Sequence, residues 1–525
     1  MTTHRARPTL PDQSGGAAFD LVVIGGGATG LSLALDATLR GFQVALFESH
    51  DFASGTSSRS TKLLHGGVRY LAQGQLGLVH EALNERQAML HIAPHLAQPL
   101  SFVMPSYRWW QTPFYGCGLM LYDLMAGQAR LGRTRWLSRS QTLQALPGVR
   151  RTGLLGGVAY WDGQFDDARM ALAFARTAQH HGAQLFNHTE VLELHSNGVG
   201  RTTLTLRDRL DQTQACVQAR CVVNATGVWV DQLRQHALPD SAPHTRLVSP
   251  SQGVHLVVDR DFLPGQQALL VPRTRDGRVL FAVPWLGKLV LGTTDTPRPD
   301  LPREPEAFAH ERQFILEEAS AVLQRPVRAS DVRSEWVGLR PLVASARMDA
   351  TGTPQLSREH TIVQDAHGLV SVVGGKWTTC RAMARDVLSH CMAYGLLPQR
   401  APAAHLIHLL GTPAPDQPPV PLHQAPGLHL YGSLAPEVLA CPGVDNPLGM
   451  GLTEAMVRHA VRVEFACCVE DVLARRWRAL FLDARQAAQM APAVADILRD
   501  EGVVQTGLEE FLKLCRHCLP HHPPL

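Results

Sequence analysis

Three stretches of the chain share one pattern, in which an apolar run leads into a turn of small residues and then a stretch of helical period. The first is FDLVVIGGGATGLSLALDATLRGFQVALFES, with apolar runs at residues 21–24 and 42–47. The others are CVVNATGVWVDQL at residues 221–233 and GLVSVVGGKWTTCRAMA at residues 368–384. Short continuous apolar runs are typical of buried parallel strands joined through helices. The pattern predicts one α/β sheet to which the chain returns after long excursions.

The excursions differ from this pattern. The runs VHLVVD, VLFAVPW and KLVLGTTD, within residues 247–343, alternate and are bounded by Gly, Pro and Asp, which predicts an antiparallel sheet. The other excursion, residues 94–146, contains SYRWWQTPFYGCGLMLYDLMAG. Its aromatic and apolar density fits either a membrane or partner surface, or ordinary core under a loop.

Proline-rich sequence follows at residues 398–427 and predicts an extended, semi-rigid linker. Beyond it, apolar residues recur every three to four positions, which predicts a helical bundle in which Glu470 and Asp471 favour the start of a helix. We therefore expect a disordered tail at 1–18, a unit at 19–397, the linker at 398–427 and a helical domain at 428–525. Within the unit, we expect nucleotide-binding segments at about 19–93, 147–246 and 344–397, and cap segments at about 94–146 and 247–343.

Composition limits the function classes. The chain has 525 residues and a net charge of +3, which provides no broad field for nucleic acid. Its ten cysteines are scattered, and no leader or spanning run is evident, so reduced thiols in the cytoplasm are expected. Cys515 and Cys518 form one Cys-x-x-Cys pair near three histidines, fewer ligands than a structural zinc needs in place. We expect no metal site.

The first glycine turn carries a dinucleotide-binding fingerprint. Gly25 allows the tight turn, Gly27 lets the backbone approach a pyrophosphate, and Gly30 brings helix and strand together. Glu48, at the end of the second apolar run, is placed to accept from a ribose hydroxyl. This fingerprint fits NAD and FAD alike.

The two later turns favour FAD. Ala225 and Gly227 leave room for a flat or extended ligand. Gly374 and Gly375 open a helix whose N-terminus suits the negative charge of a reduced flavin.

Ten ordered motifs carry a family resemblance: VIGGGATG, TSSRSTKLLHGGVRYL, APHLAQPL, WDGQFDDARM, VVNATGVWV, PSQGVH, VPWLGKLVLGTTDT, GLRPL, GGKWTT and EDVLARRWRALFLD. The chain resembles the FAD-dependent glycerol-3-phosphate dehydrogenases, quinone-linked flavoproteins related to D-amino-acid oxidase, from about Phe19 to Ala384 and again in its C-terminal part. The implied fold class is α/β, with a Rossmann-like FAD-binding domain, an antiparallel β substrate-capping domain and a C-terminal all-α domain. Leu31, Ser32 and Cys380 depart from the family pattern and put the fine placement of the flavin in question.

The resemblance implies oxidation of sn-glycerol 3-phosphate to dihydroxyacetone phosphate, with hydride transfer from C2 to flavin N5. The substrate phosphate requires cations, for which Arg69, Arg340 and Lys376 are the candidates. His255 is the candidate base, against the alternative of a core histidine bonded only to backbone. Tyr70 and Thr294 would orient the substrate. Further residues expected at the cofactor are Ser57, Ser58, Lys62, His65, Gly66, Gly67 and Thr378.

Two other functions stay open at this point. One is an oxidase or dehydrogenase of amines or amino acids, which needs one carboxylate-binding arginine, and the other is a flavin-holding scaffold without turnover. The expected partners of the leading interpretation are glycerol 3-phosphate, a ubiquinone-type acceptor and a membrane surface bound peripherally, with a homodimer admitted and no nucleic acid. The expected location is cytoplasmic, on the inner face of the plasma membrane.

Overall fold

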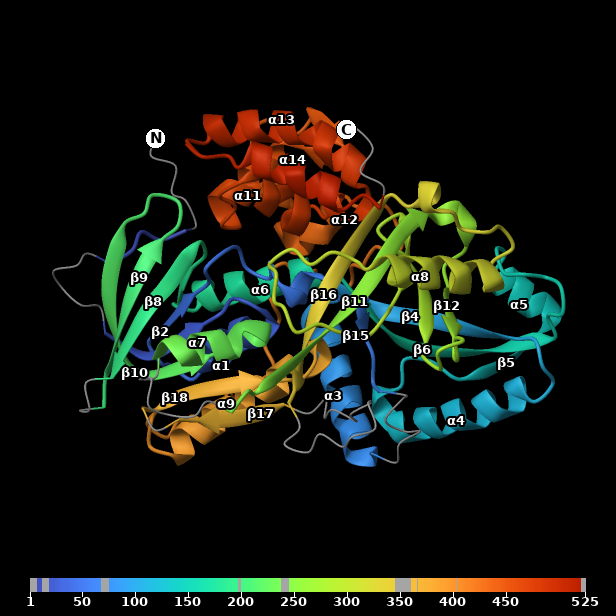
Figure 1. Ribbon diagram of the computed structural model, residues 1–525, viewed down its shortest axis with the longest axis horizontal. Coiled ribbons are helices and arrows are strands. Elements are labelled where there is room, and N and C mark those ends of the chain that lie inside the picture. Colours follow the sequence, from blue (N-terminus) through green and yellow to red (C-terminus); the bar gives the residue numbers. More distant parts are fainter. Residues whose placement is uncertain are drawn as a thin grey trace.

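Two β-sheets and a helical C-terminal part make up the protein (Figure 1). The computed structural model describes residues 7–11, 18–67, 75–196, 200–237, 245–344, 360–365, 367–403 and 405–520. No helix within these ranges is long and apolar enough to cross a bilayer.

The first sheet holds the predicted strand and turn repeats. Over the described residues it has eight strands, in the order β17-β18-β10-β1-β2-β7, with β9 paired to β10 and β8 to β9. Their bounds are β1 Ala18–Ile24, β2 Val44–Phe47, β7 Gln184–Phe186, β8 Thr189–Ser196, β9 Thr202–Asp208, β10 Gln214–Asn224, β17 Thr361–Gln364 and β18 Leu369–Val373.

The centre of this sheet is parallel, as the apolar runs predict. β1 pairs in parallel with β2 and β10, and β10 pairs in parallel with β18. One apolar core joins these strands to three helices, α1 Ala28–Leu39, α6 Asp167–His180 and α9 Cys380–Ala393. A second core joins other residues of the same strands to β8 and β9. The result is a three-layer nucleotide-binding unit.

The second sheet is mostly antiparallel and comes largely from the two predicted excursions. Its ten strands in the described chain follow the order β15-β11-β14-β13-β12-β4-β6-β3, with β16 paired to β11 and β5 to β6. Their bounds are β3 Leu63–Leu64, β4 Ala97–Ser106, β5 Arg135–Ser138, β6 Gly156–Phe165, β11 Val248–Asp259, β12 Ala268–Val271, β13 Leu280–Trp285, β14 Lys288–Gly292, β15 Thr296–Pro297 and β16 Ser334–Val343. The long strands β11 and β16 cross the middle of the molecule (Figure 1).

The C-terminal part packs on the second sheet. Its elements are α10 Ala435–Leu439, β19 Pro447–Gly449, β20 Leu452–Thr453, α11 Glu454–Val463, a π-helical turn Asp471–Arg476, α12 Ala479–Leu482, α13 Ala484–Asp500 and α14 Leu508–His517. Trp285 and Trp336 of the sheet share one apolar core with Trp477 and Phe481. The remaining helices are α3 Leu76–Ile92, α4 Gln111–Ala126, α5 Arg139–Ala145, α7 Val230–Ala237 and α8 Ala309–Val322.

The expected fold class is confirmed in its three parts, while the exact domain boundaries stay predictions. The proline-rich segment has no helix or strand in its described residues. It is nevertheless tied down, because Gln98 Nε2 donates to the carbonyl of Val420 over 2.8 Å and Leu422 N donates to Gln98 Oε1 over 3.1 Å. Leu409 and Leu422 are buried. The segment is thus part of the packed structure.

Candidate active site

A cavity of about 600 Å³ lies where the glycine turns of the first sheet meet the second sheet. Its wall includes all three turns that the sequence pattern singles out, together with residues of β11 and β16. The predicted site residues that line it are Gly25, Gly27, Glu48, Ser57, His65, Ala225, Gly227, His255, Arg340, Gly374, Gly375, Lys376 and Thr378.

The first glycine turn is too tight for side chains. A Cβ on Gly25 would lie 2.6 Å from the Ala225 carbonyl oxygen, and Gly25 has a φ of 110°, which L side chains rarely adopt. A Cβ on Gly30 would lie 2.0 Å from the Gly25 oxygen, so the helix-packing role expected of Gly30 fits this contact. Gly27 caps the N-terminus of α1 at the cavity wall. The free N–H groups of this helix suit a pyrophosphate.

Glu48 stands just beyond β2 and is fixed by the backbone around it. Its Oε2 accepts from Gly26 N over 2.7 Å, and its Oε1 accepts from His50 N over 2.9 Å. The carboxylate keeps capacity for further donors, because each oxygen has two lone pairs. A ribose hydroxyl is the donor that this position in the fold accommodates.

Ser57 and Trp377 join the first and third turns. Ser57 Oγ accepts from Ala28 N over 2.9 Å, and the indole N–H of Trp377 donates to the Ser57 carbonyl over 2.8 Å. Gly374 and Gly375 both have a φ of 78°. The 3₁₀ turn Trp377–Thr379 and α9 begin directly after them. A second helical N-terminus therefore faces the cavity.

His255 projects from β11 in a buried and neutral state. Its ring stacks on Trp336 with a centroid separation of 5.4 Å, and its Nε2 lies 2.9 Å from Thr61 Oγ1. Its Nδ1 is buried without a hydrogen-bond partner among the described residues. Burial, with added repulsion from Lys62 and Arg340, holds the pKa of His255 well below its usual 6.5.

Arg340 projects from β16 next to the same part of β11. Its guanidinium donates to Asp295 Oδ1 over 3.1 Å and to the Thr294 carbonyl over 2.9 Å. Gly253 makes space for it, because a Cβ there would lie 2.2 Å from Arg340 NH2. This guanidinium is half-buried and is held in one orientation at the cavity wall by the residues between β14 and β15.

Several predicted residues lie elsewhere. Lys62 is fully buried, with a φ of 64°, and its ammonium donates to the Ser58 carbonyl and to Asp167 Oδ2, each over 2.7 Å. It does not line the cavity, because this backbone conformation turns it into the protein core. Ser58 lies beside it and also lines no part of the cavity wall.

Gly66 and Gly67 approach protein instead of the cavity. A Cβ on Gly66 would lie 2.1 Å from the Tyr122 hydroxyl, and Gly66 N donates to Asp162 Oδ1 over 3.1 Å. Gly67 has a φ of 83° but is not a lining residue. Neither glycine lines the cavity, and their place at the flavin stays a prediction.

Thr294 also supports the site from behind. Its hydroxyl accepts from Val254 N over 3.0 Å and donates to Glu311 Oε1 over 2.8 Å, away from the cavity lining. Arg69 and Tyr70 lie outside the described residues, so their expected contacts with substrate stay predictions.

The departures from the family pattern are absorbed in the helical layer. Leu31, Ser32 and Cys380 are buried, where α1 and α9 pack together. Gly30 still contacts the turn closely, so helix and strand have not separated.

Among the cavity-wall residues that sequence reasoning missed, three bear on the chemistry. Thr61 bonds His255, Arg303 adds a cation, and Arg59 is a further cation whose guanidinium lies 2.7 Å from Glu304. Arg59 and Thr61 flank Ser60 in the same motif as Lys62, so the motif indicated that this loop contributes to the site. It did not indicate which of its residues face the cavity. No local signal marked Arg303.

FAD is the cofactor, and the cavity residues fit it. A helix N-terminus at a glycine turn suits its pyrophosphate, Glu48 suits its ribose, and the second N-terminus at residues 377–379 suits the negative charge of its reduced ring.

Comparisons with known proteins agree with FAD as the cofactor. Residues 20–387 match the family described as FAD dependent oxidoreductase, and residues 424–503 match the C-terminal domain of alpha-glycerophosphate oxidase. The mitochondrial glycerol-3-phosphate dehydrogenase of Bos taurus is 39% identical over 521 residues, covering 92% of this chain and 70% of that one. The mitochondrial glycerol-3-phosphate dehydrogenase SDP6 of Arabidopsis thaliana is 38% identical over 92% of this chain and 83% of its own.

Solved structures agree as well. Glycerol-3-phosphate dehydrogenase from Bacillus halodurans, complexed with FAD, has a TM-score of 0.75 and 29% identity, with 97% of this chain and 96% of that chain covered. L-alpha-glycerophosphate oxidase from Mycoplasma pneumoniae, at a TM-score of 0.56 and 17% identity over 75% of this chain and 98% of that one, shares the fold. The chain belongs to the FAD-dependent glycerol-3-phosphate dehydrogenases, within the FAD dependent oxidoreductases.

Proposed function

We propose that this chain oxidises sn-glycerol 3-phosphate to dihydroxyacetone phosphate and passes the electrons to a quinone at a membrane surface. The names of its relatives support the substrate. The observation that carries the proposal is that a neutral, buried His255 and the cation Arg340 line one cavity from paired strands.

The substrate phosphate requires cations near the reacting carbon. Among the described residues, the arginines and lysines that line the cavity are Arg59, Arg303, Arg340 and Lys376. Arg59 is paired with Glu304 and Arg340 with Asp295, and Arg340 extends from β16, which pairs with the strand of His255. We assign Arg340 and Lys376 to the phosphate, with Arg340 offering the planar fork that grips phosphate oxygens in pairs.

The alcohol must lose a proton as its hydride leaves. His255 lines the cavity in its neutral form and contacts Thr61 through Nε2. We assign the His255 imidazole as the acceptor of the C2 hydroxyl proton. FAD, when bound, supplies the acceptor for the hydride that leaves C2.

Anaerobic mixing of the flavin-loaded protein with sn-glycerol 3-phosphate tests this proposal. Bleaching of the flavin absorbance band by this substrate, and not by amino acids, is the expected result. Bleaching by amino acids or amines alone would assign the chain to that substrate class, and no bleaching by any of them would leave a flavin-holding scaffold.

A membrane surface is supported by helix α4 and the segments beside it. The exposed apolar side chains here include Trp109 at 81%, Phe114 at 67% and Leu124 at 77% exposure. Around them, residues 94–146 carry five exposed arginines, Arg108, Arg130, Arg133, Arg135 and Arg139. Asp123, the one acid of this segment, accepts from Thr134 N. Apolar side chains with a cationic border match an anionic lipid surface.

This surface would place the flavin protein next to a quinone dissolved in the bilayer. We propose a peripheral location on the inner face of the plasma membrane, without a spanning helix. Reoxidation of the reduced protein by ubiquinone analogues in vesicles, faster than by oxygen, is the expected result, and the reverse order would replace quinone by oxygen as acceptor.

A further inference from the structure

We propose that three arginines of the C-terminal part, Arg475, Arg476 and Arg478, position one wall of the FAD cavity and thereby determine how tightly the chain holds FAD. We call these three residues the arginine anchor. They touch neither the cavity nor any reacting atom, so they are positioning residues. The proposal depends on FAD as cofactor and not on the identity of the substrate.

The wall in question is the segment 48–58, which follows β2. It supplies a continuous run of lining residues from Ala53 to Ser57, after Glu48, Ser49 and His50. Asp51, together with Phe52, interrupts this series, because its side chain is fully buried and does not line the cavity. Ser58, at the other end of the run, also does not line the cavity. The anchor holds these two positions.

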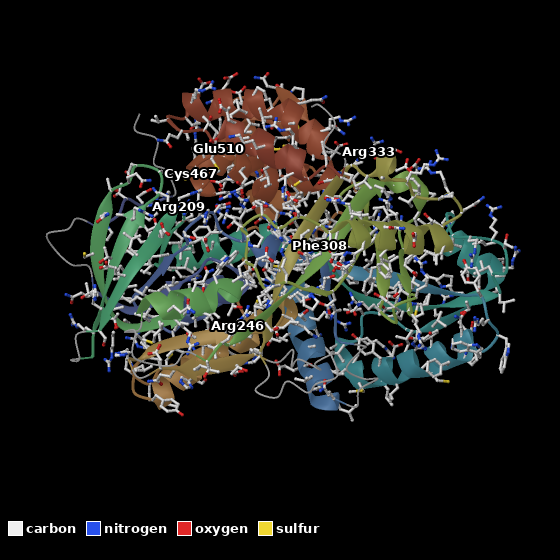
Figure 2. The ribbon with its side chains drawn as sticks, viewed as in Figure 1. Arg209, Arg246, Phe308, Arg333, Cys467 and Glu510 are labelled. Atoms are coloured by element: carbon white, nitrogen blue, oxygen red, sulfur yellow. The ribbon has the colours of Figure 1, made fainter. Side chains whose placement is uncertain are left out.

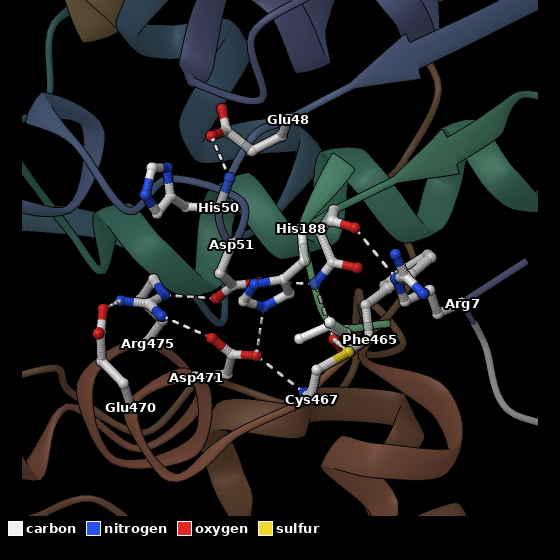
Figure 3. Close-up of polar contacts among 12 residues, drawn as sticks. Arg7, Glu48, His50, Asp51, His188, Phe465, Cys467, Glu470, Asp471 and Arg475 are labelled. Carbon is white, nitrogen blue, oxygen red and sulfur yellow. Dashed lines mark hydrogen bonds and ion pairs between the residues drawn. The ribbon is translucent and has the colours of Figure 1, made fainter. Parts of the chain in front are cut away.

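Asp51 is bound by two arginines at once. Arg475 Nε and Arg476 NH1 both donate to its Oδ2, and Arg476 NH2 donates to its Oδ1 over 3.0 Å. Asn187 adds a bond of 3.1 Å to Oδ1 and reaches the Phe465 carbonyl over 2.9 Å. Figure 3 shows Asp51 between Arg475 and the strand end that carries Glu48 and His50.

Ser58 is held through its carbonyl oxygen. Arg478 NH2 and Lys62 Nζ both donate to this oxygen over 2.7 Å, and Arg478 also bonds Asp167 Oδ1 over 3.2 Å. Arg478 is fully buried, and its NH1 donates to the Ala474 carbonyl over 2.8 Å. The π-helical turn is thereby linked to the end of the wall.

A shift of Asp51 would reach the cofactor groups directly. Ala53 N donates to the Gly26 carbonyl over 2.9 Å, and Gly26 N donates to Glu48. A Cβ on Gly26 would lie 2.7 Å from Phe52 Cδ1, so the wall packs closely against the glycine turn. The arginines therefore determine the position of the ribose acceptor Glu48 and the pyrophosphate turn together.

A second contact beside the anchor joins the same two parts of the chain. His188 Nε2 and Asp471 Oδ2 are 2.9 Å apart, and Cys467 N donates to the same oxygen over 2.8 Å. Although burial alone would raise it, the pKa of Asp471 is held well below its usual value by His188 and the neighbouring arginines. Burial raises the pKa of the Cys467 thiol to about 12, so this thiol stays protonated.

His188, Cys467 and Asp471 would otherwise have the side-chain types of a metal site. Their polar atoms are instead engaged within the protein: Arg475 donates to Asp471 Oδ1 over 2.7 Å, and the Cys467 thiol donates to the Phe465 carbonyl over 3.4 Å. The group acts as a joint between the C-terminal part and the FAD-binding unit. Figure 2 shows Cys467 and Arg209 near this boundary, where Arg209 N donates to the His188 carbonyl over 2.8 Å.

The test measures FAD release from the full-length holoenzyme. Arg475→Gln and Arg476→Gln each leave part of a buried ion network uncompensated, so we expect FAD to be released at least about tenfold faster than from the unmodified protein. Arg475→Lys and Arg476→Lys keep the charge but lose the planar fork, so FAD release should be intermediate, faster than from the unmodified protein and slower than from the glutamine variants. Arg499→Gln removes an exposed arginine of α13 that pairs with Asp496, and serves as the matched control with unchanged release.

The readout is flavin fluorescence in dilute holoenzyme, recorded far below the unfolding midpoint of each variant. A merely structural role would lower the unfolding temperature and leave release unchanged, and that result would overturn the proposal. If the glutamine variants do not fold, the lysine variants decide, since wild-type release from both would equally overturn it.

A double-variant cycle identifies the contact. Asp51→Asn combined with Arg476→Gln should accelerate release less than the product of the two single effects, because both remove one interaction. Full additivity would show that Arg476 acts elsewhere. Failure of glycerol 3-phosphate to reduce the bound flavin would contradict the proposed function and leave this result untouched.

Discussion

At the scale of the residue, His255 is kept uncharged by its surroundings. Burial, Lys62 and Arg340 all disfavour the imidazolium and lower its pKa. The group is then a proton acceptor over a wider pH range than a solvated histidine. Thr61 Oγ1 lies 2.9 Å from Nε2 and helps to fix the orientation of the ring.

Replacement of His255 by Asn should slow flavin reduction by about 10²- to 10⁴-fold, the usual contribution of a general base. Bound flavin should stay, because the glycine turns that line the cavity are unchanged. Stopped-flow absorbance measures the reduction step. His195→Asn, on the exposed end of β8, is the control, and an equal loss in both variants would remove His255 from the chemistry.

The pH profile follows from the lowered pKa of His255. The neutral, active form persists as pH falls through 6.5 and is lost only below the depressed pKa, so this residue adds no loss of rate near pH 6.5. We therefore expect the flavin-reduction rate at saturating substrate to show no decrease near pH 6.5 that depends on His255. Such a dependence would appear as a limb of the pH profile near pH 6.5 that the His255→Asn variant lacks. Such a limb, present in the original protein and absent from the variant, would contradict the assignment.

Arg340→Met should raise the KM for glycerol 3-phosphate by about 10- to 100-fold, as expected for the loss of a charged hydrogen-bonding partner. Flavin content should be unchanged. Arg340→Lys should restore only part of the effect, because lysine lacks the planar fork. Steady-state kinetics measure both, with the exposed Arg325→Met as a control; an unchanged KM in Arg340→Met would remove this residue from the phosphate site.

Residue identity was predictable where a motif implied a backbone position. The turns and strands that carry these motifs converge, so one cavity is lined by His255, Arg340, Lys376 and the turn glycines Gly25, Gly27, Gly227, Gly374 and Gly375. The position of the Lys62 side chain was not predictable, because Lys62 itself has a left-handed backbone conformation that reverses the direction of its side chain. Spacing alone does not reveal such a reversal.

At the scale of the element, helix α4 exposes an apolar face bordered by arginines. Trp109→Ser, Phe114→Ser and Leu124→Ser combined should leave the fold intact, since these side chains are mostly exposed. They should weaken binding to vesicles with anionic lipids, measured by cosedimentation, because each removes buried area in the lipid interface. Leu76→Ser, exposed on α3, is the matched control, and unchanged binding of the triple variant would move the membrane contact elsewhere.

Periodicity predicted the strand–turn–helix repeats of the first sheet, three strands of the second sheet and the helical C-terminal part, because buried strands and helices impose their own spacing. It did not predict that the proline-rich segment is pinned through Gln98, since a side-chain bond to a distant backbone leaves no local pattern. Likewise, the antiparallel pairing of β11 with β16 joins positions about 90 residues apart and is invisible to a local window.

At the scale of the whole molecule, buried ion pairs join the C-terminal part to the FAD-binding unit. Arg169 of α6 donates to Glu464 over 2.9 Å, and both side chains are buried. Burial alone would raise the pKa of Glu464, but Arg169 and its neighbours lower it to about 2.

Acid should therefore weaken this junction. A lowered carboxyl pKa contributes stability above its unfolded value of 4.5, and this contribution is lost as pH falls from 4.5 towards 2. The contribution is of order 3 kcal/mol in the free energy of unfolding. Denaturant unfolding at several pH values gives the slope of the free energy of unfolding against pH. This slope should be flatter in Glu464→Gln and unchanged in the control Glu510→Gln, because Glu510 is an exposed residue of α14 (Figure 2). Equal slopes in both variants would contradict the assignment.

The contact between Asp51 and Arg476 spans 425 positions of the sequence. During synthesis the N-terminal glycine turn emerges long before the segment that secures its wall, and chains lengthen by only about 5–20 residues per second. Stable binding of FAD is therefore expected only after the C-terminal part has been synthesised. A nascent chain stalled before residue 470 should acquire no lasting flavin, whereas the released chain should acquire it promptly.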